Sequence, residues 1–324
     1  MKINFRIKKV LLFILIFFIA AAVTFFYQVL KSQYYISAPM QDIEYKKAII
    51  KDSHNIFYKL ENLRPIAGET ELLEFIKNNN NNPQIYTPSE ENIKKGIYRA
   101  NLHMHTTESD GIASVQDRLD FAQNYAEKKL NGDYMYIAIT DHNTILGAKD
   151  VVEILQKNPG KYKNIKVVLG MEIFTAFNSK YADTPIEIHV LAWCLNPYDK
   201  FLNREFFKPK NANKLNRGEH DRNFDDVIPM MSDYSIPGIA HPVRYTDKTG
   251  KNKYLYMQEM MTRYKSLSGK PLFAEGYYQV YPRYYDKDTM KELLPYIEYV
   301  KTKANAYNII NTGSTDSHSN NIFD

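Results

Sequence analysis

Short apolar and β-branched runs recur along the chain from residue 97 onward, and segments with helical periodicity separate them. Seven runs are candidate strands: Ile97–His103, Tyr134–Thr140, Ile165–Ile173, Ile186–Trp193, Ile236–His241, Leu272–Tyr278 and Ile309–Ser314. One helix is expected to open at a capping box formed by Ser114 and Asp117 and to stop at Gly132. Further helices are expected over 148–155, 254–266 and from 288 or 289 to about 303. This alternation predicts an α/β fold with a parallel sheet, either closed as a barrel or doubly wound.

The first thirty residues have a different pattern. Basic residues within 2–9 precede a charge-free apolar run over 10–27, whose helical length approaches a hydrocarbon core of about 30 Å. The run is a membrane anchor or a signal peptide, and because it continues past the small residues 20–22, an uncleaved anchor is favoured. The preceding cations place the N-terminus in the cytoplasm. We therefore expect a membrane-anchored protein with an extracytoplasmic catalytic domain, or a secreted protein if the segment is cleaved.

Three regions are predicted along the chain. Residues 1–30 form the anchor or signal segment, and residues 31–95 form a helical stalk or cap with helices near 42–62 and 69–77. Residues 96–324 form the domain that carries the candidate chemistry.

The charge balance argues against a nucleic-acid-binding surface. The formal net charge of the 324 residues is +5, and four cations, Lys2, Arg6, Lys8 and Lys9, leave 5 − 4 = +1 for the rest of the chain. The single cysteine, Cys194, lies in an apolar run and is expected to be a small buried residue, not a metal ligand.

The stretch 101–111 carries the first candidate site. Side chains alternate in an extended strand, so His103 and His105 point to the same side and can bind one metal ion, while Met104 points to the other side. Asp110 follows in the turn before Gly111. The alternative is a strand with two partly exposed histidines and an acidic loop.

Later candidate strands also carry metal-competent residues at or just past their ends, where barrel active sites form. These residues are Asp141, His142, Glu172, His189, His241, Asp316 and His318. Together with the first site they include six of the eight histidines, whereas His220 lies in a charged segment and is expected at the surface. Neutral imidazoles mixed with carboxylates predict a multinuclear site for two or three Mn, Zn or Fe ions.

The order of these motifs resembles the polymerase-and-histidinol-phosphatase (PHP) superfamily of metal-dependent phosphoesterases. The shared features are HxH with a following SDG, then TDH, GxE, a strand histidine, AHPxR and a terminal TDSH, over about residues 97–318. The resemblance implies a distorted seven-stranded β/α barrel that holds three metal ions.

The resemblance also implies which residues bind each ion. The first ion would have the ligands His103, His105, Glu172 and Asp316. The second would share Glu172 and add His189 and His241, and the third would have Asp110, His142 and His318.

Two further residues are expected to take part in catalysis. Asp141 precedes His142 and is expected to orient the ligand shell. Arg244, in the AHPxR motif, is expected to grip the phosphate of the substrate with its planar guanidinium, and the alternative is a surface arginine paired with a carboxylate.

The sequence thus favours a metal-dependent phosphoesterase that hydrolyses a phosphomonoester or a small nucleotide-type phosphate without a protein nucleophile. Its expected partners are a small phosphorylated substrate and, through the N-terminal segment, a membrane. A metal-dependent hydrolase of another bond and a non-catalytic metal-binding membrane module remain as alternatives.

Overall fold

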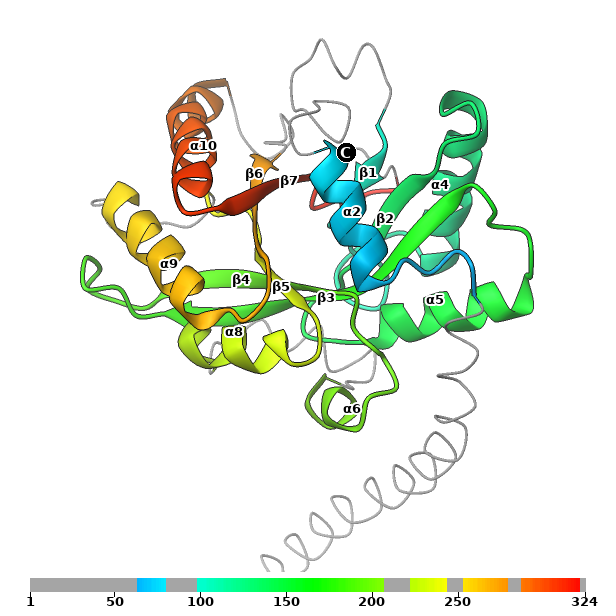
Figure 1. The fold of residues 1–324 in the computed structure, drawn as a ribbon, viewed down its shortest axis with the longest axis horizontal. Helices are drawn as coiled ribbons and strands as arrows, with labels where there is room; N and C mark the ends of the chain where they lie inside the picture. The colour runs from blue at the N-terminus through cyan, green and yellow to red at the C-terminus, as the bar shows by residue number, and fades with distance from the viewer. Residues whose placement is uncertain (1–62, 80–97, 207–221, 244–252, 279–286, 321–324) are drawn as a thin grey trace, which may run out of the picture. The chain divides into compact units, whose positions relative to one another are not determined.

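Seven strands follow one another around a single sheet, and helices cover its outer face (Figure 1). The computed structural model describes residues 63–79, 98–206, 222–243, 253–278 and 287–320. All of these residues belong to one unit, Leu60–Asp324. In chain order the elements are α2 (Glu69–Asn79), β1 (Ala100–Asn101), α4 (Val115–Lys129), β2 (Met135–Ile139), α5 (Leu146–Lys157), β3 (Ile165–Phe177), β4 (Ile186–Trp193), α6 (Lys200–Phe206), α8 (Phe224–Ser232), β5 (Ile236–Ile239), α9 (Lys253–Leu267), β6 (Leu272–Tyr278), α10 (Lys287–Ala306) and β7 (Ile309–Ser314).

The sheet curves far enough that its first and last strands approach each other. Beyond β1 and β7 the chain forms an isolated parallel bridge between Met104 and Ser317. The backbone N–H of His105 donates to the carbonyl of Ser317 at 2.9 Å. The expected α/β fold with seven strands in a distorted barrel is therefore confirmed in its architecture.

The prediction of an all-parallel sheet is wrong at β4, which runs antiparallel to both β3 and β5. The remaining neighbouring pairs, from β1 to β3 and from β5 to β7, are parallel. The connection between β3 and β4 spans only residues 178–185. A parallel crossover needs about a dozen residues or more, so this short connection requires the chain to reverse direction.

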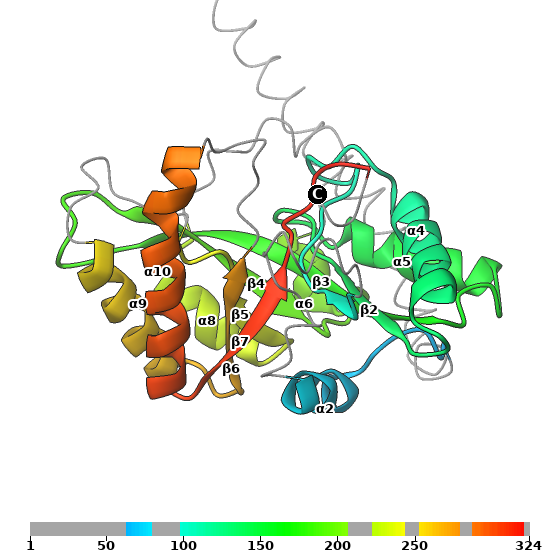
Figure 2. The same cartoon turned by 90° about the horizontal axis from the view of Figure 1, so that it is seen from above.

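Alternating side chains of the strands enter two separate apolar layers. In β2, Ile137 and Ile139 pack into the outer layer beneath the helices, whereas Tyr136 and Ala138 face the interior of the ring. The interior layer also receives apolar side chains of α2, which closes one end of the ring. In Figure 2, α2 lies on the opposite side of the strands from the chain that follows β7.

Local sequence signals explain the ends of several elements. Ser114 caps α4 and forms a capping box with Asp117, as predicted. The strand expected over 236–241 ends at Ile239, because His241 adopts a positive φ of 23° that interrupts extended structure. Helices α6 and α8 were not predicted.

The predicted membrane-anchored localisation is contradicted by the structure. Within the described part of the chain, no helix is long and apolar enough to cross a membrane. The apolar run 10–27, on which that prediction was based, lies outside the described residues.

Candidate metal centre

Glu172, a fully buried residue of β3, lies at the centre of the candidate site. Its two carboxylate oxygens contact five imidazole rings from different parts of the ring of strands. Around Oε2 lie His103 Nε2 at 3.0 Å, His105 Nε2 at 3.1 Å and His142 Nδ1 at 2.9 Å, and around Oε1 lie His189 Nδ1 at 2.7 Å and His241 Nε2 at 2.9 Å. One carboxylate therefore joins the groups that the sequence assigned to separate ions.

The first group consists of His103, His105, Glu172 and Asp316, all buried. The Nε2 atoms of the two histidines lie 3.1 Å apart, as the alternation of side chains predicts. The carboxylate oxygen Oδ1 of Asp316 lies 3.3 Å from His103 Nε2 and 2.9 Å from His105 Nε2. With the contacts of Glu172, every recorded distance between donor atoms of this group falls between 2.9 and 3.3 Å.

These spacings fit a metal ion at the centre of the group. Two ligand atoms that are each about 2.1 Å from one ion lie about 3.0 Å apart at a right angle and about 3.4 Å apart at the tetrahedral angle. Oε2 of Glu172 is buried but forms no hydrogen bond within the described structure, although three imidazole nitrogens lie close to it. The donor atoms therefore lie close enough together to share one cation, which suits metal coordination better than hydrogen bonding.

The second group surrounds Oε1 of Glu172. Both His189 and His241 reach this oxygen, and His142 joins Glu172 and His189 in a set of three whose donor atoms lie within 4.8 Å of one another. His142 therefore lies between the second and third groups, whereas the resemblance assigned it to the third group alone.

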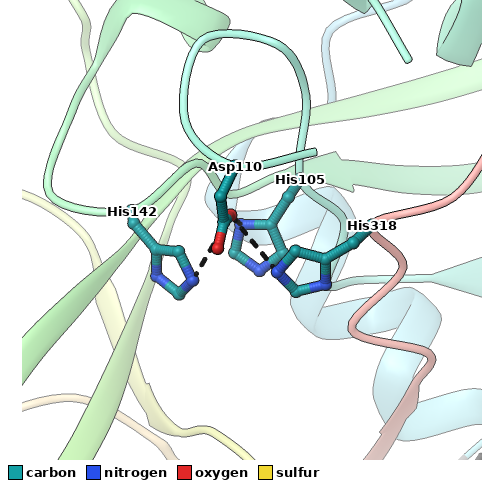
Figure 3. Close-up of side chains that lie close together, drawn as sticks. All are labelled: His105, Asp110, His142 and His318. Carbon is teal, nitrogen blue, oxygen red and sulfur yellow. Dashed lines mark ion pairs between the residues drawn. The ribbon is translucent and has the colours of Figure 1, made fainter. Parts of the chain in front are cut away.

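The third group is more exposed to solvent and brings His105, Asp110, His142 and His318 together (Figure 3). Oδ1 of Asp110 lies 3.2 Å from His318 Nε2, 3.7 Å from His142 Nε2 and 3.9 Å from His105 Nδ1. The ring of His105 stacks between those of His142 and His318, with both pairs of centroids 4.2 Å apart. The side chains of Asp110 and His318 are 30% and 27% exposed, so the site opens to solvent on this side.

Asp141 supports the loop that carries Asp110. Its carboxylate accepts hydrogen bonds from the backbone N–H of Thr106 at 2.7 Å, the Thr106 hydroxyl at 2.8 Å and the Ser109 hydroxyl at 2.6 Å. No bond joins the carboxylate to the ring of His142 within the described structure. Asp141 therefore orients the loop over 106–109 that leads to Asp110, which is compatible with the predicted role of orienting the ligand shell.

Burial and neighbouring charges act in opposite directions on the ionisable groups. Burial raises the pKa of Glu172, but the facing imidazoles, with His103 contributing most, outweigh it and hold the pKa well below its ordinary value. Burial lowers the pKa of His105, but the nearby carboxylates of Asp316 and Glu172 raise the pKa to about 10. At His142 burial dominates and lowers the pKa to about 4. Glu172 thus stays ionised and provides negative charge for a bound cation.

The two aspartates behave like Glu172. Burial raises the pKa of Asp110, but its hydrogen bond with His318 and the nearby imidazoles lower the pKa below its ordinary value. Burial also raises the pKa of Asp316, and the imidazoles of His103 and His105 hold it well below its ordinary value. The negative charge of the site is therefore distributed over all three groups.

Glu275, a buried residue of β6 whose carboxylate contacts His103 Nδ1, was not predicted from the sequence. A carboxylate within an otherwise apolar strand, Leu272–Tyr278, was the available signal.

The predicted Arg244 and His220 lie outside the described residues. Cys194 lies away from the site, and its thiol donates to the carbonyl of Ala67 at 3.9 Å.

Comparisons with known proteins show partial similarities. No family model matches the chain. It is 27% identical over 195 residues to a PolC-type DNA polymerase III of Staphylococcus saprophyticus, and the match covers 54% of this chain and 12% of that protein. It is 28% identical over 99 residues to DNA polymerase/3'-5' exonuclease PolX of Bacillus subtilis, covering 28% of this chain and 16% of that protein.

Among solved structures, an amidohydrolase from Chromobacterium violaceum with bound sulfate and no metal matches 68% of this chain and 88% of its own, with 14% identity and a TM-score of 0.43. The chain is thus similar to parts of two much longer bacterial polymerases, and it brings together a buried cluster of histidine, aspartate and glutamate that is compatible with metal binding.

Proposed function

We propose that this protein is a metal-dependent phosphoesterase of the PHP superfamily, which hydrolyses a phosphomonoester or a small nucleotide-type phosphate. The observation that carries the proposal is the first group, in which four buried donor atoms are spaced as the ligands of one ion are. The matches to PolC and PolX support the assignment, since the name of PolX includes an exonuclease, an activity that cleaves phosphoesters.

Each group would hold one ion. His103, His105, Glu172 and Asp316 would hold the first, Glu172 would bridge to a second at His189 and His241, and Asp110, His142 and His318 would hold the third. When bound, such Mn, Zn or Fe ions would polarise a phosphoryl group and lower the pKa of a water molecule.

The protein itself supplies position and a partly dry environment. His103, His105 and Glu172 are fully buried, so the inner part of the site excludes bulk water. Asp110 and His318 are partly exposed, and a substrate would approach over them. Phe174, with its ring centroid 4.4 Å from that of His142 and 4.3 Å from that of His189, would form an apolar wall beside the reacting group.

The net charge of the chain and the position of Arg244 bear on the type of substrate. The part of the chain after residue 9 has a formal charge of +1, which does not favour a long polyanion over a small phosphorylated molecule. Arg244 follows His241 by three residues, and we propose that it grips the phosphate. Its position lies outside the described residues, so this role stays a prediction.

Metal analysis and substrate assays of the full-length protein test the proposal. The protein is reconstituted with Mn²⁺, Zn²⁺ and Fe²⁺ in turn, and each form is assayed with an aryl phosphate and with an aryl amide. We expect two or three ions per chain and hydrolysis of the phosphate alone. Cleavage of the amide alone would indicate a hydrolase of another bond, and bound metal without either activity would indicate a non-catalytic module. Less than one ion per chain under all three conditions would refute the metal site itself.

A further inference from the structure

Glu275 contacts His103 on the side of the ring that faces away from the first metal-ligand group. Its side chain is buried in β6 between the candidate ligands of two other strands. Phe273 faces the interior of the ring and Ala274 faces the outer helices, so alternation turns Glu275 inward again. Gly276 follows where the pairing with β7 shifts register, and a Cβ there would meet the side chain of Asn311. A larger residue at this position would require Asn311 to move.

The carboxylate of Glu275 contacts only hydrogen-bond donors in the described structure. His103 Nδ1 lies 3.1 Å from Oε1 and 3.3 Å from Oε2. The backbone N–H of His241 donates to Oε2 at 2.6 Å, and the hydroxyl of Ser314 donates to Oε1. One side chain thus joins the segment after β1, the segment after β5 and the end of β7.

His103 uses its two ring nitrogens on opposite sides. Nδ1 faces Glu275, whereas Nε2 faces the first metal-ligand group. An ionised carboxylate only accepts hydrogen bonds, so it requires the proton of a neutral imidazole at Nδ1 and leaves the lone pair of Nε2 for a metal ion.

We propose that Glu275 is a positioning residue that selects the metal-binding tautomer of His103 and at the same time fixes the backbone of His241. This inference rests on the proposed metal-dependent function. His241 is held at a φ of 23°, which is unfavourable for a residue with a Cβ, and the short bond to Glu275 stabilises this turn. One carboxylate therefore aligns a ligand of the first ion and a ligand of the second.

Replacement of Glu275 by glutamine separates this role from simple packing. The amide has the same shape, but one of its two acceptor oxygens becomes an NH₂ donor. The backbone N–H of His241 cannot accept a hydrogen bond, so the remaining oxygen stays at the position of Oε2. The NH₂ then takes the position of Oε1, the closer of the two to His103 Nδ1. An NH₂ group opposite Nδ1 favours the tautomer that carries its proton on Nε2, and that tautomer cannot bind the ion.

Zinc affinity of the full-length protein is the appropriate measurement. The protein is stripped with a chelator and titrated with Zn²⁺ in competition with a chromophoric indicator, and the melting temperature of the metal-free form is recorded in parallel. We expect Glu275→Gln to weaken one zinc site by about ten- to a hundredfold while the metal-free protein melts near the wild-type temperature. The control is Glu259→Gln on α9, a carboxylate that also accepts hydrogen bonds, from Ser179 and Lys180, and it should leave zinc affinity unchanged.

Glu275→Asp keeps both acceptor oxygens but withdraws them by one bond of about 1.5 Å, so its zinc affinity should fall by a smaller factor, about three- to tenfold. This variant also tests the inference if the glutamine variant does not fold. Wild-type affinity in the folded variants, or a lower melting temperature with unchanged affinity, would overturn the positioning role. If the wild-type protein itself binds no zinc, manganese or iron, the proposed function fails, and this outcome is distinct from a failure at Glu275.

Discussion

Replacement of Arg118 by methionine should destabilise the protein, because this residue links two segments that carry candidate ligands. Arg118 is fully buried on α4. Its Nε and Nη2 donate to the carbonyl of His105 at 3.1 and 2.7 Å. Its Nη2 and Nη1 donate to the carbonyl and the hydroxyl of Ser317 at 2.9 and 3.1 Å. These bonds lie where the first and last strands of the ring approach each other.

The loss in free energy of unfolding depends on which hydrogen-bonding groups lose their partner in Arg118→Met. In the described structure the carbonyl of His105 accepts only from Arg118, so methionine leaves a buried carbonyl without a partner, at a cost of about 1–3 kcal/mol. The carbonyl of Ser317 keeps the N–H of His105 at 2.9 Å. The lost charged hydrogen bonds raise the total to about 3–5 kcal/mol, and removal of a buried charge offsets part of it. We expect a net loss of about 2–4 kcal/mol, or roughly 5–15 °C in melting temperature.

Urea denaturation of the metal-free protein, followed by circular dichroism, measures this loss. Arg118→Lys keeps the charge but not the planar fork, so it should lose about half as much. Arg204→Met is the control, since that side chain is 68% exposed and its contacts in the described structure are with Glu205 and the ring of Phe201. A change below about 1 kcal/mol in Arg118→Met would refute the view that this residue joins the two segments.

Glu172→Gln should lower the metal content by at least one ion per chain, measured by elemental analysis, because it replaces a carboxylate shared by five imidazoles. Gly111→Ala should destabilise the protein by about 1–3 kcal/mol in urea denaturation, since its Cβ would lie 2.6 Å from the backbone of His105, whereas Gly68→Ala meets no atom within 4 Å and should be neutral. Burial lowers the pKa of Lys253 to about 8 from 10.5, so the unfolded chain binds more protons between these pH values and the stability of the wild type should rise with pH across this range. Between pH 7.5 and pH 10 the free energy of unfolding of the wild type should rise by at most about 3 kcal/mol more than that of Lys253→Met. An equal change of this free energy with pH in the two proteins would contradict a buried ammonium.

Continuous apolar runs predicted most of the strands because both faces of these strands are buried. The observed bounds of β4, β6 and β7 are those of the predicted runs, and α4 begins after the predicted cap at Ser114. The direction of β4 could not be read from periodicity, because parallel and antiparallel strands of a covered sheet carry the same apolar pattern. Only the length of the connection 178–185 distinguished the two directions.

Most candidate ligands were predictable since a metal-competent side chain stands at or near the end of an apolar run. Glu172 and His189 lie within β3 and β4. The structure brings all nine of them together in adjoining groups, and Glu172 belongs to two of these groups. Their supporting residues were harder to predict. Asp141 was found because it precedes His142, whereas the hydrogen-bond partners of its carboxylate, Thr106 and Ser109, were not predicted.

Glu275 and Arg118 show why supporting residues escape a search based on spacing. Their partners lie far away in sequence: Glu275 is 172 residues from His103, and Arg118 is 199 residues from Ser317. Both residues bind backbone atoms as well as side chains, and a backbone N–H or carbonyl leaves no trace in the residue type of the partner. A sequence can thus contain every candidate ligand and still lack the residues that hold those ligands in place. Because residues that hydrogen-bond to metal ligands commonly alter metal affinity by ten- to a hundredfold, the presence of nine candidate ligands predicts where a metal ion would bind but not how tightly. In this protein we expect the metal affinity to depend on the buried carboxylate of Glu275 on β6.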